Sequence, residues 1–341
     1  MMADRSPKES TRILRLPRRM NLEAVRPSLR ASRKAPRSMT VVISTHNRRD
    51  ELLRTLDSLS RAVPSTVEIV VVSAASDDGT DDEVPKKYPR VRLVAAPDIG
   101  WGEANNVGYQ FASGDFLAFM GPDMVFDPGF LDTVLLGGEL PPNLGSLGTA
   151  LSRCPRSEGG PAGFQYLGYS VWHRLLVRHR FTSPSELAML RARNRRFVTV
   201  GCAPYPIVPR DVFERVGGFD PTYFYSGDEI DLAIRISQLG FENYADPSHL
   251  VYTDLTATGT PKTEYYWTRS RFIRALKFCA LPELVAILPP LLAEALGRCF
   301  LWAVRGDSDR SRAVLRALIW CARNFRSIPR LGGRSFLSNT R

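Results

Sequence analysis

Between residues 40 and 120 the sequence alternates short, strongly apolar runs with amphipathic segments, and few folds accommodate this pattern. We predict strands where β-branched and apolar residues are concentrated, over residues 40–44, 68–73, 91–95 and 116–120. Residues 48–59 and 103–112 have the apolar spacing of helices. Strands that alternate with helices form a parallel sheet with helices on both faces. The sequence therefore predicts an α/β protein with a mostly parallel, Rossmann-like central sheet.

In sheets of this kind, ligands bind at the carboxyl ends of the strands. The segments after the first, second and fourth predicted strands are therefore expected to form a site. Each contains polar residues: Thr45, His46, Asn47 and Arg48 in the first, Ser73 to Asp78 in the second, and Gly121-Pro122-Asp123 in the third.

Charge is distributed unevenly along the 341 residues, whose net charge is +11. Residues 1–38 carry 11 Lys and Arg against 3 acids, residues 39–261 carry 20 against 27, and residues 262–341 carry 15 against 5. An acidic middle part argues against a nucleic-acid-binding protein. Basic ends beside amphipathic segments favour an anionic membrane surface, with arginines on solvated faces as the alternative.

The two ends of the chain differ in amino-acid composition from the middle. Residues 1–38 are basic and interrupted by prolines, which predicts a flexible arm, and they lack the apolar run of a secretory signal. Residues 276–341 are expected to form amphipathic helices. The apolar stretch 278–304 contains prolines and charges, so it is a poor membrane-spanning helix. Two interpretations of this stretch remain: helices that lie at a membrane surface, or a helical unit packed on the core.

The five cysteines include no Cys-x-x-Cys pair, so the sequence indicates neither a disulfide framework nor a zinc site. Buried thiols in a reducing compartment are expected instead. This agrees with a cytoplasmic location.

A glycine turn and an aromatic run precede a predicted helix over residues 230–239, and three carboxylates cluster at its start. The carboxylates belong to Asp228, Glu229 and Asp231. Carboxylates that lie close together repel one another, which destabilises the folded protein unless a cation, a proton or the helix dipole compensates their charge. One interpretation is that Asp228 caps the helix and the other two favour its positive end. The other is that they belong to a catalytic site.

Six segments resemble, in order and spacing, the family 2 inverting glycosyltransferases of GT-A fold, and among them the bacterial rhamnosyltransferase-like branch. These segments are Val41–Arg48, Ser76–Thr80, Asp98–Gly108, Gly114–Asp123, Gly217–Leu232 and Glu264–Arg271. The resemblance implies a glycosyltransferase domain over residues 39–275. Its nucleotide-sugar half would cover residues 39–125 and its acceptor half residues 126–275.

The resemblance also implies roles for single residues. Asp123 matches the second acid of the family's metal-binding Asp-x-Asp element, which implies Mg²⁺ or Mn²⁺ at the diphosphate. The acid pair that contains the catalytic base falls on Asp228 and Glu229, with the two acid types reversed. Matching by position favours Glu229 as the base, and Asp228 remains the alternative. Donor-binding residues would be Thr45, His46, Asn47, Arg48, Ser73, Asp78, Gly102, Asn105, Asp123 and Arg269.

The sequence departs from the family pattern at three of these places. Ser73 stands where an aspartate usually reads the nucleotide base, and Gly121 stands where the first acid of the metal element would be. Tyr252 stands near the position of a histidine that often contacts metal or phosphate, and His249 lies three residues earlier. The metal site is therefore incomplete in sequence, and Arg269 and Arg271 could hold the diphosphate, which would lessen the dependence on metal.

We expect a glycosyltransferase that moves a hexose, such as rhamnose, from a nucleoside diphosphate to a lipid-linked or polysaccharide acceptor with inversion. Its location would be cytoplasmic, peripheral to the inner face of the plasma membrane, with a role in cell-wall or polysaccharide biosynthesis. A non-catalytic scaffold on a degenerate fold of the same kind is the alternative. A nucleotidyltransferase is disfavoured because the Gly- and Arg-rich signature after the first strand is missing.

Overall fold

The computed structural model describes residues 37–135, 139–153, 165–172, 176–182, 189, 197–253 and 260–331. Almost all of the predicted basic arm lies outside these ranges. Contacts between Cα atoms divide the chain at residues 32 and 33, so the described residues all belong to one unit. The predicted boundaries of the basic arm (1–38), the glycosyltransferase domain (39–275) and the C-terminal region (276–341) remain predictions.

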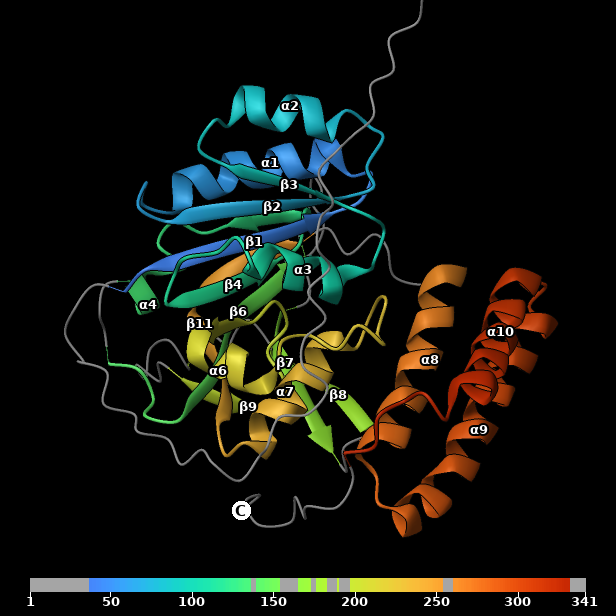
Figure 1. Ribbon diagram of the computed structural model, residues 1–341. Coiled ribbons are helices and arrows are strands. Elements are labelled where there is room, and N and C mark those ends of the chain that lie inside the picture. The colour runs from blue at the N-terminus through green and yellow to red at the C-terminus, as the bar shows by residue number, and fades with distance from the viewer. Residues whose placement is uncertain are drawn as a thin grey trace, which may run out of the picture. The chain divides into compact units, whose positions relative to one another are not determined.

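The amino-terminal half of the fold is a parallel sheet, as predicted (Figure 1). Its central strands are ordered β3-β2-β1-β4, and each neighbouring pair is parallel. The elements of this half are β1 (Met39–Thr45), α1 (Arg49–Ala62), β2 (Glu68–Ala74), α2 (Thr80–Lys87), β3 (Arg92–Ala96), α3 (Trp101–Tyr109) and β4 (Phe116–Met120).

Helices cover both faces of this sheet because successive side chains of a strand point to opposite sides. Val41 and Ile43 of β1 belong to one apolar cluster with Leu52 and Leu56 of α1. Val42, between them, packs on the other face in a cluster with helix residues such as Phe213. Every side chain of β1 is buried, which accounts for its unbroken β-branched run.

The sheet continues into a mixed half that the sequence pattern did not predict. Beyond β4 the order is β10-β6-β11-β5, with β7 beside β6 and β9 beside β11. Strand β10 is antiparallel to both of its neighbours, whereas β6 and β11 are parallel. The elements are β5 (Met124–Phe126), α4 (Asp132–Leu135), β6 (Leu144–Arg153), β7 (Gln165–Trp172), β8 (Leu176–Thr182), β9 (Val198–Val200), β10 (Ile207–Pro209), α6 (Arg210–Val216), α7 (Asp228–Gln238) and β11 (Glu242–Thr253).

Three helices follow, and they lie side by side in Figure 1: α8 (Pro261–Phe278), α9 (Leu281–Val304) and α10 (Ser308–Asn324). Their contact surfaces form one apolar cluster that includes Phe272 and Leu276 of α8, Leu291 of α9 and Val314 of α10. This confirms the predicted C-terminal helices. Helix α9 runs unbroken through Pro289 and Pro290, although prolines remove backbone hydrogen bonds inside a helix.

Candidate active site

A pocket of about 290 Å³ lies at the carboxyl ends of β1 and β2, where the topology predicts a ligand site. Of the residues predicted from sequence, Thr45, His46 and Arg48 line it. The sequence analysis did not select several others, which come from the segment before α3, the loop before α7 and the first turn of α8. They include Asp98, Trp101, Phe224, Tyr225 and Lys262.

The loop after β1 is fixed by hydrogen bonds. The Nδ1 atom of His46 lies 2.7 Å from the carbonyl oxygen of Ala74, so this ring nitrogen carries the donated proton. Asn47 has a positive φ of 51°. Its amide oxygen accepts from the backbone N–H of Asp77 at 2.8 Å, and its own N–H donates to Ser76. Asn47 therefore connects two loops at the sheet edge and does not line the pocket.

Arg48 and Asp123 form an ion pair beside the pocket. The Nη1 atom of Arg48 lies 3.2 Å from Oδ2 of Asp123, and its Nη2 atom lies 3.4 Å from Oε1 of Glu51. Burial lowers the pKa of Arg48, but the two carboxylates outweigh this effect and raise it. The side chain of Asp123 is 11% exposed. The carboxylate predicted to bind metal therefore contacts a guanidinium here.

The described residues do not fit a metal site made by the protein alone. Within them, no three His, Cys, Asp or Glu side chains gather closely enough to hold an ion. Tyr252 lies on β11 opposite Val125 of β5. The positive charge next to the pocket is supplied by Arg48 and Lys262.

Two buried hydroxyl groups lie next to each other where β1 and β2 end. Thr45 and Ser73 are paired in register. Their exposed fractions are 3% and 1%, and neither oxygen has a hydrogen-bond partner within the described ranges. Asp78, by contrast, accepts from the N–H of Arg49 at 2.7 Å and from the hydroxyl of Thr80 at 2.6 Å. Although burial raises the pKa of Asp78, these hydrogen bonds lower it overall.

Helix α3 contacts the predicted catalytic acids through Gly102. A Cβ atom at this position would lie 2.9 Å from Oδ2 of Asp228, so only glycine allows this close approach. Asn105 is fully buried and donates to the carbonyl oxygen of Trp101 at 2.9 Å. Its amide oxygen has no partner in the part of the chain that is described. Gly102 and Asn105 therefore lie behind the pocket wall.

Asp228 and Glu229 begin α7, but their surroundings differ. Asp228 is 1% exposed, whereas Glu229 is half-buried. Burial raises the pKa of Asp228 well above its usual range, and the charge of Glu229 raises it further. Glu229 accepts a hydrogen bond from the N–H of Gly227 at 3.1 Å. Asp228 therefore keeps its proton to a higher pH than an ordinary aspartate does. Glu229 is the more accessible carboxylate.

The loop before α7 brings these acids toward the pocket. Tyr225 lines the pocket, and its pKa is raised first by burial and then by the charge of Asp123, with further effects of Asp228 and Glu229. The carbonyl oxygen of Phe224 accepts from the N–H of Trp101 at 3.0 Å, which holds the loop against α3. The loop that precedes the two acids thus forms part of the pocket wall.

Arg269 lies outside the pocket. Its guanidinium stacks on Trp320 of α10, 3.7 Å from the ring centre, and donates to the carbonyl oxygen of Thr222. Lys262, which the sequence analysis missed, lies in the first turn of the same helix and lines the pocket. The capping residue Thr260 followed by Pro261 was the available signal, because this pair marks a helix start.

Comparison with known proteins identifies the class of protein. Residues 40–140 match the family model "Glycosyl transferase family 2". An N-acetylglucosaminyl-diphospho-decaprenol L-rhamnosyltransferase of Mycobacterium tuberculosis is 27% identical over 230 residues, which cover 62% of this chain and 74% of the relative. A validoxylamine A glucosyltransferase of Streptomyces hygroscopicus is 29% identical over 222 residues, or 59% of this chain and 48% of that protein.

Two solved structures share the fold. GalNAc-T7 with UDP, GalNAc and Mn²⁺ aligns with a TM-score of 0.53 and 19% identity, over 69% of this chain and 47% of that chain. A mannosyltransferase of Pyrobaculum calidifontis with GDP-Man and Mn²⁺ aligns with a TM-score of 0.51 and 17% identity, over 84% of this chain and 88% of that chain. The fold is GT-A. Residues 40–140 therefore form a family 2 glycosyltransferase domain, and the chain is similar to an enzyme of the rhamnosyltransferase type.

Proposed function

We propose that the protein transfers a hexose, such as rhamnose, from a nucleoside diphosphate to a hydroxyl group of a lipid-linked or polysaccharide acceptor, with inversion. One observation carries this proposal. A pocket at the carboxyl ends of the parallel strands contains two cations, Arg48 and Lys262. The carboxylate pair follows the lining residue Tyr225 in sequence, and Asp228 packs against Gly102, the neighbour of the lining residue Trp101. A donor diphosphate needs such cations, and an acceptor hydroxyl needs such a base.

In this proposal, Glu229 is the general base and Asp228 is a positioning residue. Glu229 takes the proton of the acceptor hydroxyl while the acceptor oxygen bonds to the anomeric carbon. The bond from that carbon to the diphosphate oxygen breaks, and the nucleoside diphosphate leaves with the bonding electrons. Arg48 and Lys262 stabilise the charge that develops on the leaving group. Asp228 is too deeply buried to meet the acceptor directly.

The acceptor class rests on the relative from Mycobacterium tuberculosis, whose name specifies a diphospho-decaprenol substrate. A lipid-linked acceptor requires the enzyme to work at a membrane. By length and composition, α9 is the one helix in the described ranges that could cross a bilayer, and only 22% of its most apolar 18-residue window is buried inside the protein. We propose that α9 lies at the inner face of the plasma membrane, which agrees with the basic C-terminal region.

A thermal-shift panel tests donor binding directly. The purified protein is heated with UDP, dTDP, GDP or CDP, each with and without Mg²⁺ or Mn²⁺. A ligand at 100 times its dissociation constant stabilises a protein by about 2.7 kcal/mol, so one nucleotide should raise the melting temperature clearly. Dependence of this shift on the ion would support a divalent ion at the diphosphate, with Asp123 as its ligand. No shift with any nucleotide would favour the non-catalytic scaffold.

Donor hydrolysis then tests the base. Glu229→Gln is expected to abolish most hydrolysis and transfer while the nucleotide shift is retained. Glu139→Gln, at an exposed glutamate outside the pocket, is the matched control and should behave like the wild type. If Glu229→Gln kept full activity and Asp228→Asn lost it, the two roles would be exchanged.

A further inference from the structure

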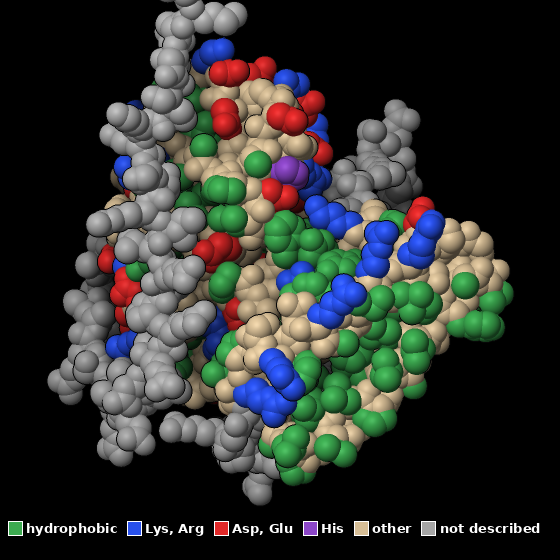
Figure 2. Space-filling model, turned by 45° about the vertical axis from the view of Figure 1, so that its right-hand side comes forward, with side chains coloured by type: hydrophobic (Ala, Val, Ile, Leu, Met, Phe, Trp, Pro, Cys, Tyr) green, Lys and Arg blue, Asp and Glu red, His purple; other side chains and the backbone are tan. Residues whose placement is uncertain are grey.

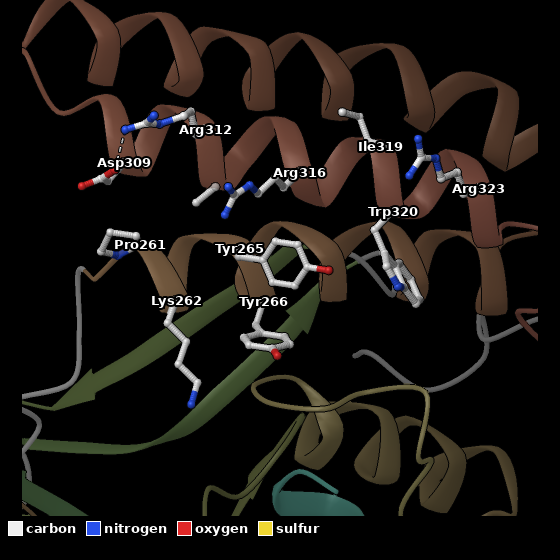
Figure 3. Close-up of a pocket in the computed structure, with 11 residues that line it drawn as sticks. Pro261, Lys262, Tyr265, Tyr266, Asp309, Arg312, Arg316, Ile319, Trp320 and Arg323 are labelled. Carbon is white, nitrogen blue, oxygen red and sulfur yellow. Dashed lines mark hydrogen bonds and ion pairs between the residues drawn. The ribbon is translucent and has the colours of Figure 1, made fainter. Parts of the chain in front are cut away.

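A second, larger cavity lies between α8 and α10, with a volume of about 940 Å³ (Figure 3). We call it the α8–α10 groove. Tyr265 and Tyr266 of α8 and Trp320 of α10 give it aromatic walls. Figure 3 shows Arg316 extending from α10 toward Tyr265. The groove thus combines aromatic surface with a cation between two packed helices.

The charge of the groove is strongly positive. Its lining includes four cations, Lys262, Arg312, Arg316 and Arg323, and a single acid, Asp309. Arg312 pairs with Asp309 at 2.8 Å. Among the residues that the structure describes, no carboxylate pairs with the other three. The two guanidinium groups among these three, those of Arg316 and Arg323, lie about two turns apart along α10. Such groups suit an anion with several oxygens, such as a diphosphate.

The groove is connected to the pocket of the candidate active site. Lys262 lines both cavities. Tyr266, in the wall of the groove, stacks on Phe224 of the pocket wall with ring centres 5.3 Å apart. A molecule held in the groove therefore lies beside the proposed donor site.

An apolar surface adjoins the groove on the same group of helices. Figure 2 shows hydrophobic side chains gathered over the C-terminal helices, with Lys and Arg side chains among them. The exposed apolar residues of α9 are Leu281, Val285, Leu292, Leu296, Phe300, Leu301 and Val304. In the groove itself, Ile319 is 50% exposed. Apolar and cationic surfaces side by side match a lipid whose head group is a diphosphate.

We propose that the α8–α10 groove binds the diphosphate of a polyprenyl-linked acceptor, with Arg316 and Arg323 as its principal contacts. This inference rests on the proposed function, because it names the part of the acceptor that the transferase holds. The acceptor sugar would extend past Lys262 toward Glu229, while the hydrocarbon chain stays with the membrane. The groove would then set affinity for the acceptor and leave the chemical step to the other pocket.

The test measures sedimentation of the full-length protein with two kinds of phosphatidylcholine vesicle. One contains a small fraction of undecaprenyl diphosphate, and the other contains phosphatidylglycerol at matched charge. The double variant Arg316→Gln/Arg323→Gln should bind the diphosphate vesicles roughly tenfold more weakly. Arg326→Gln/Arg330→Gln removes two exposed cations outside the groove and is the matched control, expected to stay within about twofold of the wild type.

The outcomes separate this inference from the proposed function. Loss of diphosphate binding in the groove variant, with its nucleotide-dependent thermal shift unchanged, supports the groove. Equal losses in both double variants, or equal binding of the wild type to both vesicles, would overturn it and indicate a general attraction to anionic lipids. Failure of the wild type to hydrolyse any donor would instead count against the transferase activity.

Discussion

Replacing Lys277 with methionine is expected to destabilise the protein by about 3–5 kcal/mol, the usual cost of breaking a buried ion pair. Lys277 is 2% exposed and Asp231 is fully buried. The ammonium group lies 2.5 Å from Oδ1 of Asp231 and also contacts Asp220. Methionine keeps the apolar stem and removes the charge. Asp231 keeps its contact with Arg235 at 2.6 Å, so the lower part of the range is expected.

Lys87→Met is the matched control. Lys87 contacts Asp57 at 2.9 Å, but the two side chains are 50% and 42% exposed. Exposed pairs contribute at most about 1 kcal/mol, so this variant should unfold nearly like the wild type. Urea unfolding at pH 7, followed by circular dichroism, measures both differences. If Lys277→Met lost no more stability than Lys87→Met, the claim that Lys277 connects α8 to α7 would be refuted.

Urea unfolding at lower pH tests whether the charge of Lys277 causes the stability difference between the wild type and Lys277→Met. Burial raises the pKa of Asp220, but the charge and hydrogen bond of Lys277 outweigh this and lower it below its usual value. Stabilisation from a lowered folded-state pKa is complete above the unfolded pKa of about 3.9 and is lost as the pH falls through the folded-state value. The difference between the wild type and Lys277→Met should therefore shrink below about pH 4.

Three further predictions concern the site and the sheet beneath it. The Asp228→Asn variant should become more stable than the wild type as the pH rises above about 4. The wild type loses stability there, because Asp228 has a raised folded-state pKa and its ionised form is unfavourable in the folded protein; urea unfolding at pH 5 and 8 measures the difference. Gly108→Ala should lower the free energy of unfolding by about 1–3 kcal/mol, because the added Cβ would clash with Val42. Thermal unfolding measures this loss. Arg48→Gln should weaken nucleotide binding by about tenfold in calorimetric titration without preventing folding.

The amino-terminal half of the fold was predictable because its signals are local. The run Phe116–Met120 matches β4 at both ends, and every side chain in it is buried. Helix α2 was missed because it is only eight residues long and contains Pro85, although its acidic first turn is favourable for a helix start. The mixed half depends on pairings between distant segments. Strand β10 has three residues, yet it separates β4 from β6, and no local pattern specifies that position.

The candidate site was predictable for similar reasons, and only in part. Thr45, His46 and Arg48 follow a strand whose end defines the sheet edge, so the topology alone brings them to the pocket. Lys262 reaches the pocket because α8 packs beside α7, which depends on tertiary contacts such as that of Lys277. The resemblance placed Arg269 at the donor, whereas the structure places it between α8 and α10, against Trp320.

Helix α8 shows why deleting the C-terminal region would be a poor test of membrane binding. Its residues Phe272 and Leu276 pack against α9 and α10, so a deletion would expose the helix that also carries Lys262. Point variants avoid this difficulty. Val285 and Phe300 of α9 are 67% and 71% exposed, so their replacement by serine should weaken vesicle sedimentation while urea unfolding stays unchanged. Val125→Ser, at an exposed valine of β5, is the control, and equal sedimentation of all three proteins would contradict the proposed membrane-facing role of α9.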